Sequence, residues 1–323
     1  MADFDIFNGD ADGITALLQL RLAEPREAQL VTGVKRDIAL LERPELSEVG
    51  EGDHLVVLDL SLDKNRAPLE QFLERGAEVF YCDHHYAGAV PGSSRLLSLI
   101  NEAPEVCTSL LVNGYLRGRF AAWAVVGAFG DNLHDSARRL AVNIGLNEQQ
   151  SEALCELGEL LNYNGYGESL SDLHFHPAEL FIELLEFESP LELIENAAPA
   201  LTALRAGYAE DVAACDQVET LLSNVAGIVK LLPNAPWARR ISGVWANQLA
   251  RENPDSAVAL LTEKTGGYLV SVRAPLSRRT GAARLCRQFA SGGGREAAAG
   301  INLLAEQDRD KFLSEFSNNF ISL

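Results

Sequence analysis

Short apolar segments alternate with amphipathic ones through the first half of the chain. The pattern predicts strands at 3–7, 28–32, 54–60 and 78–82, and helices at 13–23 and 64–75. Residues 54–60 are almost continuously apolar, which is typical of a parallel strand whose two faces are both buried. Because strands that alternate with helices form βαβ units, we expect an N-terminal domain built on a doubly wound parallel sheet.

The pattern changes after residue 136. Residues 136–207 are mostly helical, and the last hundred residues combine strands at 256–262, 268–273 and 300–304 with helices at 281–290 and 307–320. A chain of 323 residues is long enough for about two domains. We therefore divide this α/β protein into a domain at 1–195, which includes a helical linker, and a smaller α/β domain at 196–323. We expect the active site in the cleft between the two domains.

Charge narrows the range of partners. The chain carries 27 Lys and Arg against 46 Asp and Glu, which is a formal net charge of −19. Proteins that bind long nucleic acid need an extended basic face, because release of phosphate counterions supplies most of the affinity. We therefore expect no long nucleic acid as a partner, and instead a small anionic ligand held in a local basic pocket.

The sequence shows no signal for export or for a membrane. Its longest apolar run, at 120–129, is about half the length that a membrane-spanning helix needs, and the acidic N-terminus lacks the basic start of a signal peptide. The five cysteines are scattered and include no CxxC pair, which argues against a disulfide framework or a structural zinc site. We expect a cytoplasmic protein without a membrane partner, and we leave a homodimer open.

Acidic residues and histidines follow four apolar segments, each of which we take as strand-like. They are Asp10 and Asp12 after 3–7, Asp59 directly after the apolar residues 56–58, Asp83, His84 and His85 after 78–82, and Asp131 after 124–129. The carboxyl ends of parallel strands meet at one edge of an open α/β sheet, so these side chains should form a dense anionic cluster. Oxygen ligands with one or two imidazoles suit manganese or magnesium, and the nitrogen ligand favours manganese.

Each of these elements also has an ordinary structural interpretation. An aspartate at the end of a strand is more often a helix cap or a turn residue, and a pair of histidines is more often a packing or surface feature. The Asp-x-Asp-Gly sequence also occurs in calcium-binding loops and in plain turns. The order and spacing of the four segments together are much more specific than any one of them.

The four segments resemble the motifs of the DHH phosphoesterase superfamily. The matching residues are Asn8-Gly-Asp-Ala-Asp-Gly13, Val57-Leu58-Asp59, Asp83-His84-His85 and Gly127-Ala-Phe-Gly-Asp131, and Ser291-Gly-Gly-Gly-Arg-Glu-Ala-Ala-Ala-Gly300 resembles the signature of the DHH-associated domain. The resemblance implies a catalytic domain at 1–195 and a substrate-binding domain at 196–323. The superfamily includes RecJ-type exonucleases, nanoRNases, pyrophosphatases and exopolyphosphatases, so the motifs indicate the superfamily but not the substrate.

The resemblance also implies roles for the individual residues. Two metal ions would be held by Asp10, Asp12, Asp59, His84 and Asp131, with Asp59 as the bridge. Asp83 would be a ligand or the neighbour of one, and His85 would face the substrate phosphate, so Asp59, Asp83, His84 and His85 form the catalytic group. Pyrophosphatases and nanoRNases carry a histidine four residues before the first aspartate, where this chain has Ile6. We therefore expect the first ion to be held more loosely.

The C-terminal glycine run is the second candidate site. The N–H groups of Gly292, Gly293 and Gly294, beside a short helix that starts at Arg295, would form an anion-binding nest, and a flexible turn is the alternative. Arg295 stands where the family usually has histidine, and its guanidinium offers two donors to a phosphate. Arg273 matches a second phosphate-contacting position, or is a surface arginine. His174 and His176 could ligate a metal, but a structural loop is the favoured interpretation.

Two classes of function remain. The leading hypothesis is a manganese-dependent phosphodiesterase, with two ions and with magnesium as the alternative metal, that hydrolyses dinucleotides such as pGpG or other short oligonucleotides to mononucleotides. Within enzymes, the alternatives are a RecJ-like single-strand exonuclease and a polyphosphate or cyclic-dinucleotide hydrolase. A nucleotide sensor without catalysis is the alternative from another class, and Ile6 and Arg295 would favour it. The retained carboxylate cluster argues against a sensor, which gains nothing from it.

Overall fold

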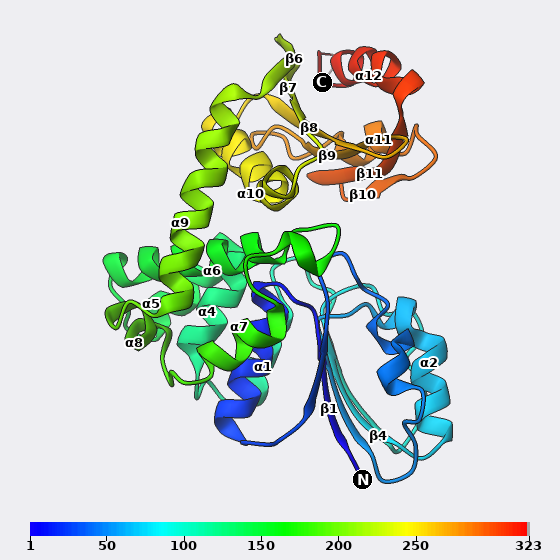
Figure 1. Ribbon diagram of the computed structural model, residues 1–323, viewed down its shortest axis with the longest axis vertical. Helices are drawn as coiled ribbons and strands as arrows, with labels where there is room; N and C mark the ends of the chain where they lie inside the picture. Colours follow the sequence, from blue (N-terminus) through cyan, green and yellow to red (C-terminus); the bar gives the residue numbers. More distant parts are fainter. Residues whose placement is uncertain (322–323) are drawn as a thin grey trace. The chain divides into compact units, whose positions relative to one another are not determined.

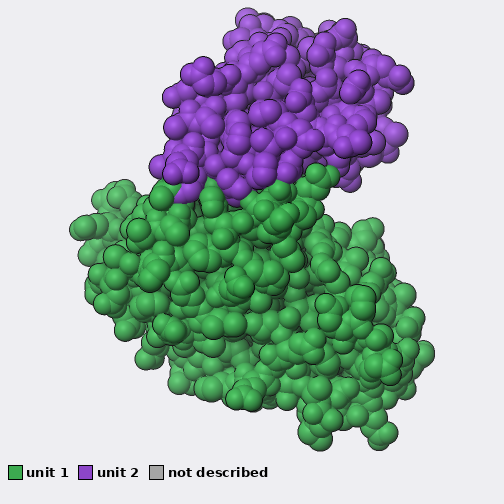
Figure 2. Space-filling model, viewed as in Figure 1, with its two compact units in different colours: residues 1–206 green, residues 207–323 purple. Residues whose placement is uncertain are grey.

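The structure, a computed structural model, describes residues 1–321 and contains two separate sheets (Figure 1). The chain divides into two units, Met1–Ala206 and Gly207–Leu323, which Figure 2 colours green and purple. The division lies within helix α9 (Pro199–Ala214), a little later than the boundary that the sequence pattern suggests. Each unit has a sheet and an apolar core of its own.

The N-terminal unit is built on a five-stranded parallel sheet in the order β2-β1-β3-β4-β5. Its strands are β1 (Asp3–Phe7), β2 (Gln29–Thr32), β3 (His54–Leu58), β4 (Glu78–Asp83) and β5 (Leu96–Ile100). Helices α1 (Ala11–Ala23) and α2 (Leu62–Glu74) lie on opposite faces of the sheet, which confirms the doubly wound arrangement (Figure 1). The sequence pattern does not predict β5, an edge strand in which Leu97 is 56% exposed.

The central strands are buried on both faces, as their apolar runs predict. Ile6 in β1 and Val57 in β3 are 0% exposed and belong to a core cluster that Leu69 and Phe72 of α2 complete. Helix α1 packs against α4 and α6 as well as against the strands. Each buried aliphatic or aromatic side chain stabilises a fold by about 1.5–3 kcal/mol. This core holds the strand ends, where the candidate site residues lie, in fixed positions.

Helices make up the rest of the N-terminal unit. They are α3 (Thr108–Tyr115), α4 (Ala121–Gly130), α5 (His134–Asn143), α6 (Glu148–Gly165), α7 (Pro177–Leu184), α8 (Pro190–Glu195) and α9. The prediction of a strand-like segment at 124–129 is wrong, because these residues lie inside α4. A continuous apolar run does not distinguish a buried strand from a helix that is packed on all sides. Such packing is close here: a Cβ atom on Gly130 would lie 2.2 Å from the Cβ of Ala11 in α1.

The C-terminal unit contains a six-stranded mixed sheet in the order β10-β11-β9-β8-β7-β6. Its strands are β6 (Glu219–Asn224), β7 (Gly227–Leu232), β8 (Ala257–Lys264), β9 (Gly267–Arg273), β10 (Gly292–Gly294) and β11 (Ala298–Ala305), and its helices after α9 are α10 (Pro236–Glu252), α11 (Ala282–Cys286) and α12 (Arg309–Ile321). Three phenylalanines of α12, Phe312, Phe316 and Phe320, lie in the core of this unit. None of the helices within residues 1–321 is long and apolar enough to cross a membrane.

The glycine run differs from its prediction. Residues 292–294 form the edge strand β10, in which Gly293 pairs with Gly300 of the antiparallel strand β11. Arg295 lies in the connection to β11, where its N–H donates to the carbonyl of Ala298 at 2.9 Å, and it does not start a helix. In an extended strand, successive N–H groups point in opposite directions, so they cannot converge on one anion. The prediction of a nest beside a helix start is therefore wrong.

Candidate metal centre

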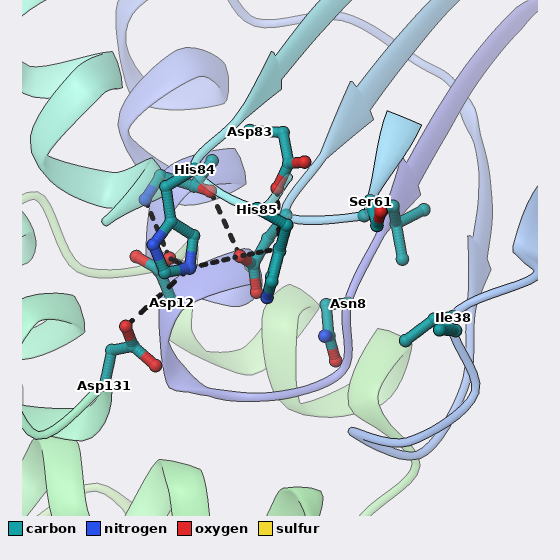
Figure 3. Close-up of polar contacts among 12 residues, drawn as sticks. Asn8, Asp12, Ile38, Ser61, Asp83, His84, His85 and Asp131 are labelled. Atoms are coloured by element: carbon teal, nitrogen blue, oxygen red, sulfur yellow. Dashed lines mark hydrogen bonds and ion pairs between the residues drawn. The ribbon is translucent and has the colours of Figure 1, made fainter. Parts of the chain in front are cut away.

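Acidic side chains and histidines from three parallel strands gather at the carboxyl edge of the N-terminal sheet (Figure 3). Asp10 and Asp12 follow β1, Asp59 follows β3, and Asp83, His84 and His85 lie at and after the end of β4. Asp131 joins them as the residue that ends helix α4, not as the end of a strand. The structure thus brings together every residue that the sequence predicts for the metal site.

Two helix N-termini hold the first pair of aspartates. Asp10 caps α1, because its Oδ1 accepts the N–H groups of Asp12 and Gly13, both at 3.1 Å. The carboxylate of Asp12 accepts the N–H groups of Thr108 at 2.8 Å and Ser109 at 2.7 Å, in the first turn of α3. Gly13 permits this tight turn, since a Cβ atom there would lie 2.2 Å from the carbonyl oxygen of Asn8. Both aspartates therefore accept hydrogen bonds from helix N-termini, and they also lie in the acidic cluster that the sequence predicts.

Asp59 lies at the centre of the cluster in an unusual backbone conformation. Its φ angle is 59°, a left-handed value that costs a non-glycine residue about 1–3 kcal/mol. Its N–H donates to Cys82 at 3.0 Å, and its Oδ1 accepts the Thr108 hydroxyl at 3.1 Å. Burial, followed by the charges of Asp12 and Asp10, raises the pKa of Asp59 well above its usual range. Backbone strain together with charge repulsion at one buried carboxylate indicates a functional site. A bound cation would relieve the repulsion between Asp59 and its neighbours.

The two adjacent histidines have different environments. The Nε2 atom of His84 lies 3.5 Å from Asp59 Oδ1, 3.7 Å from Asp131 Oδ2 and 3.9 Å from Asp12 Oδ2, and burial lowers the pKa of this imidazole. His85 contacts Asp83 Oδ1 through Nδ1 at 2.7 Å. Partial burial would lower the pKa of His85, but the hydrogen bond and charge of Asp83 outweigh it and the pKa is raised. His84 therefore suits a neutral metal ligand, and His85 suits a cationic donor.

The chemistry of these donors fits a divalent cation. Two sets of residues could each hold an ion, because the ligand atoms within a set all lie within 4.8 Å of one another. One set is Asp59, His84 and His85, and the other is Asp12, His84 and Asp131. Within the described residues, Asp83 Oδ2 and Asn8 Oδ1 are buried acceptors beside this cluster without a hydrogen-bond partner. A buried acceptor without a donor is unfavourable by about 1–3 kcal/mol, and a nearby cation removes part of that penalty. Carboxylate oxygens with an imidazole nitrogen suit manganese or magnesium.

Lys35 is a member of the cluster that the sequence pattern does not reveal. Its Nζ lies 2.6 Å from Asp10 Oδ2, 2.8 Å from Asn162 Oδ1 and 3.9 Å from Asp131 Oδ1. Partial burial would lower the pKa of Lys35, but the charge of Asp10 outweighs it and raises that pKa well above its usual range. Burial would likewise raise the pKa of Asp10, but Lys35 lowers it. The sequence did offer one indication of this role: Lys35 comes shortly after the predicted strand at 28–32, so it should lie at the same edge of the sheet as the aspartates.

His174 and His176 do not join the cluster. The Nε2 atom of His174 lies 2.7 Å from the hydroxyl of Tyr163, and Nδ1 of His176 accepts the N–H of Ala178 at 3.2 Å, which caps α7. These contacts match the structural-loop interpretation of the two histidines.

The candidate substrate-binding residues of the C-terminal unit are more exposed. Arg295 is exposed after β10, and Arg273 at the end of β9 donates from Nε to Asn247 Oδ1 at 2.6 Å. A pocket of about 440 Å³ in this unit is lined by Thr280, Gly281, Arg284, Arg287 and Glu296. Arg287 donates to the carbonyl of Gly294 at 3.5 Å, so the pocket borders the glycine strand. The unit therefore offers cationic side chains to an anion, although residues 292–294 form a strand and not a backbone nest.

Comparisons with known proteins found one matching domain family and several structures with a similar fold. The DHHA1 domain family matches residues 224–322. The fold is similar to that of the exonuclease RecJ bound to manganese, with a TM-score of 0.64 and 18% identity over 100% of this chain and 90% of that chain. It is also similar to a DHH-domain protein described as a member of the s1p family of ribosomal proteins, with a TM-score of 0.67 and 15% identity over 100% of this chain and 87% of that chain.

A third similar structure is the pGpG-specific phosphodiesterase PggH from Vibrio cholerae, with a TM-score of 0.56 and 14% identity over 100% of this chain and 99% of that chain. The comparison with curated proteins found no match. The similar structures confirm the α/β fold that the sequence predicts, and the match at 224–322 confirms the resemblance of the glycine-rich segment. Identities this low show a shared fold and not a shared substrate.

Proposed function

We propose that this chain, a member of the DHH phosphoesterase superfamily with a C-terminal DHHA1 domain, is a metal-dependent phosphodiesterase that hydrolyses very short nucleotides such as pGpG. The observation that carries the proposal is the convergence of three carboxylates, from Asp12, Asp59 and Asp131, on the Nε2 atom of His84. RecJ and PggH, whose structures are similar, are described as an exonuclease and a phosphodiesterase. That similarity supports hydrolysis of a phosphodiester.

The residues of the cluster would divide the chemistry between them. Asp12, Asp59, His84 and Asp131 would hold the cation, with manganese as the expected ion and magnesium as the alternative. A bound cation of this kind neutralises phosphoryl oxygens and lowers the pKa of a bound water towards neutrality. His85, which Asp83 orients through the 2.7 Å contact, would donate to the substrate phosphate. Asp83 would thus act by positioning His85.

The resemblance predicts two ions, with Asp59 as the bridge between them. Asp59 Oδ1 lies 3.5 Å from His84 Nε2 and 3.9 Å from His85 Nδ1, which is a suitable place for a shared ligand. Asp10, which would complete the set for the first ion, is instead paired with Lys35. This difference bears on the number of ions that the site holds.

We propose a short substrate because the strongly acidic chain offers little basic surface to a long polyanion. A net charge of −19 opposes the counterion release on which binding of long nucleic acid depends. The C-terminal unit supplies local positive charge, with Arg295 and Arg273 and with the pocket beside Arg287. We assign catalysis to residues 1–195 and substrate anchoring to residues 196–323, in a cytoplasmic protein that needs no membrane partner.

A length series of substrates tests the proposal. Purified protein with manganese would be given 5′-phosphorylated oligonucleotides from pGpG upwards. We expect the highest kcat/KM for the dinucleotide and a steep fall beyond about four nucleotides, because a chain with a net charge of −19 gives a longer strand little of the extended basic surface that adds affinity with length. Asp59→Asn serves as the inactive control in every assay.

A RecJ-like single-strand exonuclease is the second candidate, because the motifs at 8–13 and 83–85 also resemble those of RecJ-type exonucleases. Its signature in the same experiment is a kcat/KM that rises with length. Polyphosphate and cyclic dinucleotides complete the panel as alternative substrates. A protein that binds manganese and pGpG but cleaves none of these substrates would be a sensor, and the proposed hydrolysis would be wrong.

A further inference from the structure

Lys35 contributes a positive charge to the carboxylate cluster from the loop that follows β2. Its Nζ lies between Asp10 Oδ2 at 2.6 Å and Asp131 Oδ1 at 3.9 Å, and it also contacts Asn162 Oδ1 at 2.8 Å. Its backbone is held at both ends, because its N–H donates to Gly165 at 2.8 Å and its carbonyl accepts Asn8 Nδ2 at 3.3 Å. The side chain is 22% exposed. The ammonium is therefore part of the site and not a surface group that happens to lie nearby.

Asp10 already has a cation close to it, because the Lys35 Nζ lies 2.6 Å from its Oδ2. Its Oδ1 accepts the N–H groups of Asp12 and Gly13, and its Oδ2 contacts Lys35. Among the described residues, Asp10 belongs to neither of the two sets of ligand atoms that could hold an ion. Ile6, four residues earlier, is a core residue with 0% exposure and offers no ligand either. The Asp10 side of the cluster already has its cation, in the form of the Lys35 ammonium.

The other side of the cluster has ligands for a single ion. Both candidate sets depend on His84, and its Nε2 is the atom that lies within 3.9 Å of all three carboxylates. The ring of His84 also makes a hydrogen bond to the backbone of Val106. An unprotonated imidazole nitrogen has one lone pair and therefore binds one ion. The two sets therefore describe one ion site, and because His85 Nδ1 is 2.7 Å from Asp83 Oδ1, the ligands that remain are Asp12, Asp59, His84 and Asp131.

We propose that Lys35 takes the place of a second metal ion, so that this protein binds one divalent cation, at Asp12, Asp59, His84 and Asp131. The Lys35 ammonium then serves as a permanent counter-charge to Asp10 and Asp131. A lysine ammonium is a compact charge with three donors, so it can neutralise carboxylates without a fixed coordination geometry. The inference concerns the metal count alone and therefore stands or falls separately from the proposed hydrolysis.

Metal counting on the intact chain tests this proposal. The key variant is Lys35→Met, which keeps an unbranched side chain and removes the charge. The matched control is Arg36→Met, which removes an equal charge from the next, exposed residue. Each protein is saturated with manganese and desalted, its metal content is measured by mass spectrometry, and its manganese is examined by electron paramagnetic resonance.

We expect one manganese per chain in the wild type and in Arg36→Met, with the spectrum of an isolated ion. Lys35→Met should bind two, with the broadened spectrum of ions that interact. Two ions in the wild type would overturn the proposal, and so would a count that stays at one in Lys35→Met. Circular dichroism shows whether the variant is folded, and the wild-type count decides the matter even if it is not. No substrate is needed, so loss of the proposed hydrolysis would leave this result unaffected.

Discussion

The carboxylate edge of the N-terminal sheet and the glycine strand of the C-terminal unit are both candidate sites, but the chain holds them very differently. In the first, Asp12 and Asp59 are buried and bonded to α3, so their carboxyl groups are held in position before any ligand arrives. In the second, Arg295 is exposed at the edge of a sheet. Preorganised charge acts mainly on the transition state, whereas a flexible contact binds substrate and transition state alike. We expect changes at the first site to alter rate and metal binding, and changes at the second to alter KM.

The largest effect is expected at Asp59, the carboxylate at the centre of the buried site. Asparagine tolerates the left-handed backbone of residue 59 but removes the charge that would hold the cation. Because such a cation contributes several kcal/mol to the transition state, Asp59→Asn should lower kcat/KM on pGpG by about 10³-fold or more. Steady-state rates at saturating manganese measure this loss.

A matched control for Asp59 is Asp63→Asn, at a partly exposed carboxylate in α2 that contacts Lys64. It changes the net charge equally and should leave the rate unchanged. Near-normal turnover by Asp59→Asn would show that the central carboxylate does not hold the catalytic cation.

The next largest effect is expected for metal affinity at His84. This imidazole lies where three carboxylates converge, and its removal leaves one nitrogen ligand fewer. Removal of a residue that only orients a metal ligand weakens metal binding by about 10- to 100-fold. Because His84 would be a ligand itself, His84→Ala should weaken manganese binding by about 100-fold or more. Calorimetric titration of the metal-free protein measures it. His54→Ala, at the far end of β3, is the control, and equal affinities for the two variants would make His84 a packing residue.

A smaller effect is expected at Arg295, in the exposed region. If its guanidinium binds the 5′-phosphate of the substrate, Arg295→Ala should raise KM by about 10- to 100-fold and change kcat less, as loss of a charge-assisted hydrogen bond does. Manganese content should stay the same, because arginine does not ligate the ion. Kinetics on pGpG and on the dinucleotide without the 5′-phosphate, for both proteins, close a double cycle.

This double cycle shows whether Arg295 binds the substrate or has only a structural role. Arg309→Ala, on α12 of the same unit, is the control for removal of an exposed charge. A coupling energy near zero between Arg295 and the 5′-phosphate would mean that the arginine does not anchor the substrate.

The smallest effect concerns the stability of the metal-free protein. Burial, then the neighbouring carboxylates, raises the pKa of Asp59, and burial, then Asp10, raises that of Asp12. Such a carboxyl group binds its proton more tightly in the folded state, so stability should fall as the pH rises above the unfolded pKa of about 4 and through the raised folded values. The Asp10–Lys35 pair acts in the opposite direction, because Lys35 lowers the pKa of Asp10 against the effect of burial.

Thermal unfolding of metal-free protein between about pH 5 and 8 measures this dependence. We expect Tm to fall less steeply with pH in Asp59→Asn, which should be more stable than the wild type near neutrality by about 1 kcal/mol. Manganese should restore the stability of the wild type and not of the variant. Parallel pH profiles for the two metal-free proteins would show that Asp59 is not repelled by its neighbours.

Local patterns were enough to predict the parallel sheet and the residues at its edge. A strand buried on both faces leaves a continuous apolar run, and the next residue then lies at the carboxyl end of the sheet, as Asp59 does after β3. The spacing of the four motifs likewise identified Asp10, Asp83 and His84 without knowledge of their contacts. These predictions succeeded because each depends on only a few consecutive residues.

Only the tertiary structure decided the features that depend on distant neighbours. The run at 124–129 is a helix because α1 and α6 pack against it, and the glycines at 292–294 form a strand because β11 offers a partner. Lys35 carries no motif, yet it lies 2.6 Å from Asp10 because β2 pairs with β1 in parallel. The sequence alone therefore determined which residues gather at the edge of the N-terminal sheet, whereas the contact between Lys35 and Asp10 depends on strand pairing that brings the two residues together.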